Sequence, residues 1–301
     1  MLIEQAFMSI PEIMLGSGYV RQEYEAGIIS AFSLAILQEL NGKNVPKPIS
    51  CMCAERKYLQ EFGLRADLFV DLSNTLIGSS ALSNYGFRFR NWIESKYFRH
   101  TKGTIPSTQN LGLIVRDLLR LMSLPPLEVS PKKTTEEKLS MTGRYLLHVY
   151  QGDPLKYLSL KRKGKNTKER IWPAKLLESG YQEVDSLELE QEPKSFQKIV
   201  GEKLITTKVT FGVTNFILRS INYKKIQGLT FALSRIEFFS LEFENQHFEI
   251  RADRSFGEAE KHKWLQNSFA KELMKKSTKE SELSSKNDLG DDEYVQEDDT
   301  P

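Results

Sequence analysis

A carboxylate and an ammonium group stand two residues apart in the apolar segment at 92–98, as Glu94 and Lys96. In a β-strand, side chains two residues apart project from the same face, so this pair would be presented as a unit. A second carboxylate, Asp67, lies in an earlier apolar run at 66–72. Two carboxylates that converge from neighbouring strands form a hard-oxygen site that suits Mg²⁺, and a phosphodiester offers oxygens for such a metal to polarise. The adjacent lysine would orient or deprotonate the attacking water.

The geometry of the two strands decides which aspartate joins this pair. If they form a hairpin that turns near residues 80–81, Asp67 lies opposite Glu94, whereas Asp71 lies nearer Arg90. This register favours Asp67, and Asp71 stays the alternative. Another interpretation needs no metal, because Glu94 and its lysine could form an ordinary charged pair on a solvated face of the sheet.

Glu-x-Lys is a short pattern, and it occurs four times in the chain. The copies begin at Glu55, Glu94, Glu136 and Glu192. Only the copy at Glu94 lies in an apolar, aromatic run with an acidic strand before it, whereas the others lie in polar stretches or beside proline. The surroundings, rather than the tripeptide, therefore single out Glu94 and Lys96.

Hydrophobic periodicity predicts the elements that would position these residues. Apolar residues at helical spacing predict a helix over 19–40, which places Glu25 at the edge of a buried stripe, one turn before Ile28 and Ile29. Strands are expected at 66–72, 87–98 and 143–150, a helix at 109–124, further strands between 204 and 250, and a last helix at 259–274. The expected fold class is α/β, with a mixed β-sheet flanked by helices and an additional β-rich C-terminal half.

At these residues the sequence resembles the PD-(D/E)XK nuclease superfamily. The pattern of that superfamily is an acidic residue on one strand, Glu-x-Lys on the next strand and often a glutamate on a preceding helix. The matching residues are Asp67, Glu94 and Lys96, with Glu25 at the position of the helical glutamate. The resemblance covers residues 20–150 and implies a restriction-endonuclease-like core. It also implies a Mg²⁺-dependent endonuclease in which Asp67 and Glu94 bind the metal, Lys96 positions the attacking water, and Glu25 assists.

Within that superfamily, the size of the chain and its β-rich second half look most like a Type II restriction endonuclease. This resemblance implies a homodimer that cuts double-stranded DNA at a specific sequence, with a cognate DNA methyltransferase as its genetic partner. The residues expected to contact DNA phosphates are basic and lie in the densest positive segment or beside the site: Lys161, Arg162, Lys163, Lys165, Lys168, Arg170, Arg88 and Arg90. Two alternatives stay open, a structure-specific repair or recombination nuclease and a non-catalytic nucleic-acid-binding module.

Charge is distributed unevenly along the chain. The formal net charge is +2 over 301 residues, yet residues 280–301 hold nine acidic residues and one lysine. The rest of the chain is therefore strongly basic, and a strongly basic body attracts polyanions. We expect a catalytic core at 1–160, a basic loop and β-rich extension for DNA binding and dimerisation at 161–276, and a disordered acidic tail at 277–301.

Composition excludes several classes of protein. Only two cysteines, Cys51 and Cys53, are present, which argues against a secreted disulfide scaffold and indicates a reducing, cytoplasmic location. The most apolar run, at 27–37, is too short to span a bilayer, so no membrane association is expected. His148 lies between two apolar residues and is expected to be a hydrogen-bonded histidine of the core or the sheet.

Overall fold

The structure is a computed structural model of the chain. It describes residues 2–16, 25–58, 64–73, 75, 88–98, 107–125, 142–158, 171–201, 204, 207–219, 228–243, 246–251 and 269–273. The basic segment expected at 161–170 and the expected acidic tail lie outside these residues. The predictions made for those two segments are therefore not addressed by the structure.

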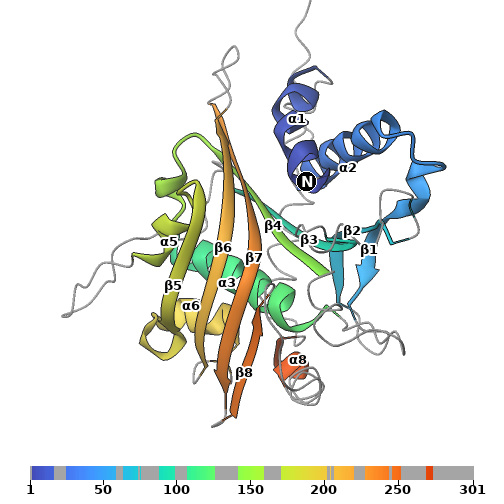
Figure 1. Ribbon diagram of the computed structural model, residues 1–301. Coiled ribbons are helices and arrows are strands. Elements are labelled where there is room, and N and C mark those ends of the chain that lie inside the picture. The colour runs from blue at the N-terminus through green and yellow to red at the C-terminus, as the bar shows by residue number, and fades with distance from the viewer. Residues whose placement is uncertain are drawn as a thin grey trace, which may run out of the picture.

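Helices and strands follow one another along the described chain (Figure 1). The first half contains α1 (Leu2–Gly16), α2 (Glu25–Gly42), η2 (Pro48–Cys51), β1 (Met52–Lys57), β2 (Arg65–Asp71), β3 (Arg90–Phe98), α3 (Ser107–Ser123) and β4 (Thr142–Gln151). The second half contains η4 (Pro154–Lys156), α5 (Trp172–Lys175), β5 (Gly180–Glu188), η5 (Leu189–Gln191), α6 (Lys194–Val200), β6 (Lys208–Arg219), β7 (Leu229–Phe243), β8 (Gln246–Arg251) and α8 (Ala270–Leu273).

All eight described strands belong to one mixed sheet, with the order β1-β2-β3-β4-β7-β6-β5 and with β8 paired to β7. β3 and β4 are parallel, which requires a crossover, and α3 lies in the segment between them. β4 then pairs in antiparallel fashion with β7. The sheet therefore continues across residue 160, where the sequence predicted the end of the catalytic core, and a difference in role between the two halves stays a prediction.

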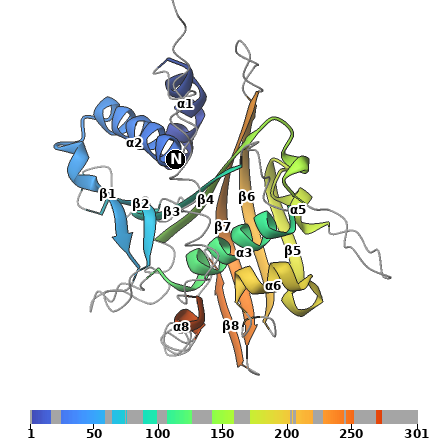
Figure 2. The same ribbon diagram turned by 180° about the vertical axis from the view of Figure 1, so that it is seen from behind.

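Helices cover the sheet on two sides. α1 and α2 pack on the face that carries Leu68 and Ile93, and α3 and α6 belong to the core on the face that carries Phe69 and Trp92. Figure 2 shows α3 and α6 lying across the sheet on the side away from α1 and α2. Because side chains alternate between the two faces of a strand, neighbouring residues of β2 and β3 belong to different cores. β4 lies between these layers and is buried along nearly its whole length.

The α/β class, the mixed sheet and the flanking helices are as expected. The helix predicted at 19–40 is described as α2 from Glu25 onwards, and the strands predicted around Asp67 and Glu94 are β2 and β3. α1 and β1 were not predicted, since α1 contains an internal proline and β1 is a polar strand whose residues after Met52 are exposed. Among the described helices, none is both long and apolar enough to cross a membrane.

Candidate active site

Asp67 of β2 and Glu94 of β3 meet on one face of the sheet. β2 and β3 are antiparallel, and their register pairs Leu68 with Ile93. When this register is continued by one residue, Asp67 lies opposite Glu94. The same pairing follows from a turn near residues 80–81, as predicted from the sequence. The backbone N–H of Ser95 donates a hydrogen bond of 2.6 Å to Asp67 Oδ2, which holds the aspartate against β3.

Lys96 lies between two carboxylates that come from different helices. Its Nζ atom is 3.3 Å from Glu25 Oε1 on α2 and 3.2 Å from Asp117 Oδ2 on α3. Because α2 and α3 belong to cores on opposite faces of the sheet, charged groups from both layers meet at this lysine. The structure thus brings together the four residues expected from the sequence, Glu25, Asp67, Glu94 and Lys96, and adds Asp117 to them.

Four carboxylates surround one ammonium group, and the excess of negative charge affects the pKa values of the cluster. Burial lowers the pKa of Lys96, but the carboxylates, Asp117 foremost, outweigh it and raise that pKa well above its usual range. Burial raises the pKa of Glu94 strongly and that of Asp67 as well. Burial also raises the pKa of Glu25 to about 7, although Lys96 opposes this change. Lys96 is therefore protonated at neutral pH, a state that suits orienting a water molecule rather than deprotonating it.

Tyr58, which sequence reasoning missed, contacts this cluster from the end of β1. Its hydroxyl donates a hydrogen bond of 2.5 Å to Glu94 Oε1. Its ring stacks on that of Trp92, with 5.2 Å between the ring centroids, and both rings are buried. The stacking fixes the ring of Tyr58, so the hydroxyl holds the carboxylate of Glu94 in one orientation.

Asp117 and Arg120 of α3 are two further charged residues that the sequence analysis did not select. They are three positions apart, so they share one side of the helix, and Arg120 Nη1 donates a hydrogen bond of 3.2 Å to Asp117 Oδ1. Both are buried. The signal that could have identified them is the presence of charged residues in a helix whose residues from Asn110 onwards are, apart from Leu113, all buried.

Asp71, the alternative metal ligand, does not join the cluster. It pairs with Arg90 in the register of β2 and β3, and its Oδ2 atom lies 3.6 Å from Arg90 Nε. The other carboxylate oxygen of Asp71, Oδ1, accepts a hydrogen bond from the backbone N–H of Ser73. The structure therefore places Asp67, and not Asp71, beside Glu94, while a contact between Arg90 and DNA stays a prediction.

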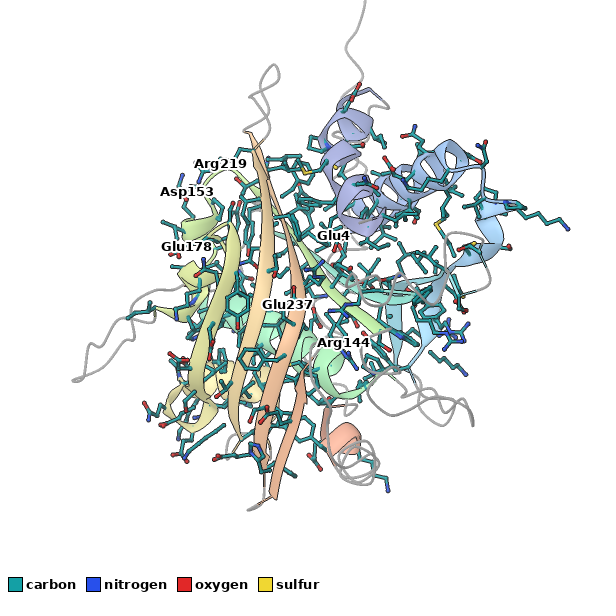
Figure 3. All side chains as sticks on the ribbon, viewed as in Figure 1. Glu4, Arg144, Asp153, Glu178, Arg219 and Glu237 are labelled. Carbon is teal, nitrogen blue, oxygen red and sulfur yellow. The ribbon has the colours of Figure 1, made fainter. Side chains whose placement is uncertain are left out.

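Arg88, another expected DNA contact, is buried in a second ionic network that joins α1 to β7. Its Nη2 atom lies 3.5 Å from Glu237 Oε2. Arg235 lies 2.7 Å from the other oxygen of Glu237 and 2.6 Å from Glu4 Oε1 of α1, and both of these carboxylates are labelled in Figure 3. The guanidinium of Arg88 thus binds a carboxylate of the protein itself, and its contact with DNA stays a prediction.

His148 is a buried, hydrogen-bonded histidine of the sheet, as expected. Its Nδ1 atom lies 2.7 Å from the hydroxyl of Tyr150, and its Nε2 atom lies 3.2 Å from Ser234 Oγ. Burial lowers the pKa of His148 to about 3, so the imidazole is neutral at pH 7. Although it neighbours Lys96 in the register of β3 and β4, it adds no charge to the cluster.

The donor set of Asp67 and Glu94 fits a hard cation that needs few protein ligands. Among the described residues, no group of three or more histidine, cysteine, aspartate or glutamate side chains is arranged to hold a metal ion. Mg²⁺, however, is usually bound through one or two carboxylates and retains several waters. The negative charge of Asp67 raises the pKa of Glu94 further, and a cation bound between the two carboxylates would relieve this repulsion.

Comparison with known proteins identifies no relative. No family model matches the chain, and no curated protein or solved structure is significantly similar to it. The geometry of the cluster and the order of the elements that carry it are therefore the basis for a function.

Proposed function

We propose that the protein is a Mg²⁺-dependent endonuclease that hydrolyses phosphodiester bonds of double-stranded DNA. The observation that carries this proposal is the meeting of Asp67 and Glu94 on adjacent antiparallel strands, with Lys96 two residues further along the same face. Glu25 reaches Lys96 from α2. These are the four residue types, on the same kinds of element, that the resemblance to the PD-(D/E)XK superfamily implies.

The order of the elements supports the finer assignment to a restriction-endonuclease-like core. α2, β1, β2, β3, α3 and β4 follow one another along the chain. β2 and β3 are antiparallel, whereas β3 and β4 are parallel neighbours. Apart from β1, which adds a strand before the hairpin of β2 and β3, this is the order of helix, hairpin, helix and strand that the resemblance covers. The proposed core therefore agrees with the mixed sheet observed in the first half of the chain.

Asp67 and Glu94 are the residues that would hold Mg²⁺. When bound, this ion supplies Lewis-acid polarisation of a phosphoryl oxygen and makes an attacking water more acidic. The hydrogen bonds from Ser95 N–H to Asp67 and from Tyr58 to Glu94 fix both carboxylates before any ligand arrives. Fixed ligands lose little freedom on binding, which favours a defined site over a flexible one.

The other charged residues would act on the substrate and on protons. Lys96 carries a permanent positive charge at neutral pH, so it can orient the attacking water and offset negative charge that develops on the phosphate. Glu25 has a pKa of about 7, so both of its protonation states are populated near neutral pH. A group with such a pKa can take up a proton during turnover and release it afterwards.

We further propose that cutting is sequence-specific and that the active form is a homodimer, as in a Type II restriction enzyme. A cut in both strands needs two sites, and two-fold symmetry is the simplest way to supply them. The basic segment at 161–170 would bind phosphates, which set affinity and register without reading sequence. A cognate DNA methyltransferase would then be the genetic partner.

A non-catalytic nucleic-acid-binding module is the alternative that one observation favours. The ammonium of Lys96 already contacts Glu25 and Asp117, as it would in an ion cluster that serves only to join α2 and α3 to the sheet. In that case, binding to DNA would persist unchanged when Glu94 or Lys96 is replaced. A structure-specific repair nuclease would use the same site on branched or flapped DNA.

Cleavage of unmethylated phage DNA by purified protein tests the proposal. Incubation with Mg²⁺ is expected to yield discrete bands that disappear in EDTA and with Glu94→Ala or Lys96→Ala. Glu55→Ala and Lys57→Ala are matched controls, because they remove the same residue types from the exposed Glu-x-Lys copy on β1 and should cut normally. A smear would indicate a nuclease without sequence specificity. Intact DNA of shifted mobility would overturn the proposal in favour of the binding module.

A further inference from the structure

We propose that Asp117 and Arg120 of α3 are positioning residues for Lys96, the lysine of the Glu-x-Lys pair. This inference rests on the proposed nuclease function and adds two residues that the Glu-x-Lys pattern does not contain. Neither would act on the substrate itself. Asp117 would hold Lys96, and Arg120 would hold Asp117.

Complementary spacing of charges on β3 and α3 is the first argument. Glu94 and Lys96 are two apart on a strand, and Asp117 and Arg120 are three apart on a helix, so each pair shares one face of its element. Across the interface, Asp117 Oδ2 lies 3.2 Å from Lys96 Nζ. Within α3, Arg120 Nη1 lies 3.2 Å from Asp117 Oδ1. Asp117 thus contacts the lysine of the strand and is itself held by an arginine of its own helix.

Burial is the second argument. Only 1% of the Asp117 side chain is exposed, and Arg120 is also buried. Buried ion pairs contribute little net stability, because desolvation of the charges offsets their attraction. A helix whose residues mostly enter an apolar core would therefore gain little from these charges if they served only to stabilise the fold. Their place beside Glu94 and Lys96 indicates a role in the cluster.

Arg116, the residue next to Asp117, contacts α6 and α8. Its two terminal nitrogens donate hydrogen bonds of 3.0 and 3.1 Å to the backbone carbonyls of Ile199 and Leu273. It thereby ties α3 to α6 and α8. Two neighbouring buried charges of α3 thus contact different parts of the fold.

The role of Asp117 follows from the flexibility of lysine. A lysine side chain is a flexible four-carbon stem, and ordering it costs conformational entropy. Contact with Glu25 alone would fix the ammonium from one side, and Glu25 keeps 39% of its side chain exposed. Asp117 supplies the rigid contact from within the core. Without its negative charge, Lys96 would sample more positions, and catalysis that depends on its position would slow while binding of DNA would not.

Steady-state kinetics of Asp117→Asn and Asp117→Glu test this inference. We expect Asp117→Asn to lower kcat by about 10- to 100-fold with little change in KM, as is typical of residues that orient catalytic groups. Asp117→Glu, which restores the charge, should recover part of the rate.

Glu4→Gln is the matched control, because it also alters a buried carboxylate that pairs with an arginine, Arg235, but in the second ionic network. It should lower the melting temperature and leave kcat unchanged. If wild type cuts DNA and Asp117→Asn cuts at the same rate, or if Asp117→Glu recovers none of the lost rate, the inference is wrong although the proposed function stands. If wild type cuts no DNA, the proposed function is wrong, and this inference falls with it.

Discussion

Tyr58 donates a hydrogen bond of 2.5 Å to Glu94 Oε1, although β1 and β3 are not neighbours in the sheet. β2 lies between them, so the bond joins the end of the first strand to the middle of the third. Tyr58 is buried, whereas most of β1 is exposed. The edge of the sheet therefore contributes one buried side chain to the site, and that side chain orients a proposed metal ligand.

Replacement of Tyr58 by phenylalanine should weaken both stability and cleavage. The ring would still stack on Trp92, but Glu94 would lose a buried hydrogen-bond donor. A buried polar group without its partner costs about 1–3 kcal/mol, so the free energy of unfolding should fall by about that amount. Urea denaturation at pH 7 measures this change, and the cleavage rate should fall in parallel because the carboxylate is no longer held.

Tyr157→Phe is the control for that substitution. The hydroxyl of Tyr157 donates a hydrogen bond of 2.8 Å to the carbonyl of Gln151, away from the cluster. Its loss should lower stability and leave cleavage unchanged. Equal cleavage by the Tyr58 and Tyr157 variants would show that the bond to Glu94 has no part in the reaction.

Glu25 should make stability depend on pH. Burial raises its pKa from 4.5 to about 7, so the folded chain binds this proton more tightly than the unfolded chain. Its contribution to the free energy of unfolding is therefore full below about pH 4.5 and is lost as the pH rises to about 7. The free energy of unfolding of wild type, relative to that of Glu25→Gln, should therefore decline as the pH rises from about 4.5 to about 7. Because 39% of the side chain is exposed, the decline should be modest.

Urea denaturation of wild type and Glu25→Gln at matched ionic strength, from pH 4 to pH 8, gives the required comparison. The difference in free energy between the two proteins should change only within the interval named above. A difference that is constant over the whole range, or one that grows with pH, would contradict the raised pKa.

The pairing of Asp67 with Glu94 could be predicted from the sequence, because it depends on local properties of two strands. Both strands are apolar runs, and the position of the turn between them fixes their register. The helix that carries Glu25 was equally visible, since its apolar residues recur at helical spacing. The sequence pattern of apolar residues within each of these strands and helices is enough to predict it, so the four proposed site residues could be selected without a structure.

The rest of the cluster depends on contacts between elements far apart in the chain. Tyr58 follows a strand, β1, whose exposed and polar residues do not show the alternation of a half-buried strand. Asp117 lies on a helix that was predicted, but its partner Lys96 lies on a strand, and only the packing of α3 on the sheet brings them together. Periodicity indicates which residues are buried and does not indicate which buried charges meet.

Arg144 on β4 should be a charge whose removal stabilises the protein. It lies near the start of β4 (Figure 3) and is buried. In the described part of the chain, its Nε and Nη2 atoms have no hydrogen-bond acceptor, and its guanidinium lies 5.8 Å from the ring of Phe239. Burial, with Arg88 nearby, lowers its pKa to about 9. Arg144→Met should therefore raise the free energy of unfolding by about 1 kcal/mol or more.

Arg235→Met is the matched control, and its expected change in the free energy of unfolding has the opposite sign. Arg235 binds Glu4 and Glu237, so its removal takes the arginine from one buried and one half-buried carboxylate. Its loss should lower the free energy of unfolding by about 3 kcal/mol. Urea denaturation of both variants at pH 7 measures the two changes. A loss of stability in Arg144→Met similar to that in Arg235→Met would show that Arg144 is paired in solution.

The central claim is that Asp67 and Glu94 form a metal site at which DNA is cut, and a comparison of two aspartate variants tests it most directly. Asp67→Asn and Asp71→Asn make the same change four residues apart on the same strand, and only Asp67 lies beside Glu94. Mg²⁺-dependent cleavage of duplex DNA is the quantity to measure. We predict that Asp67→Asn abolishes cleavage while Asp71→Asn retains it. Cleavage by Asp67→Asn at the wild-type rate, or no cleavage by wild type, would contradict the account.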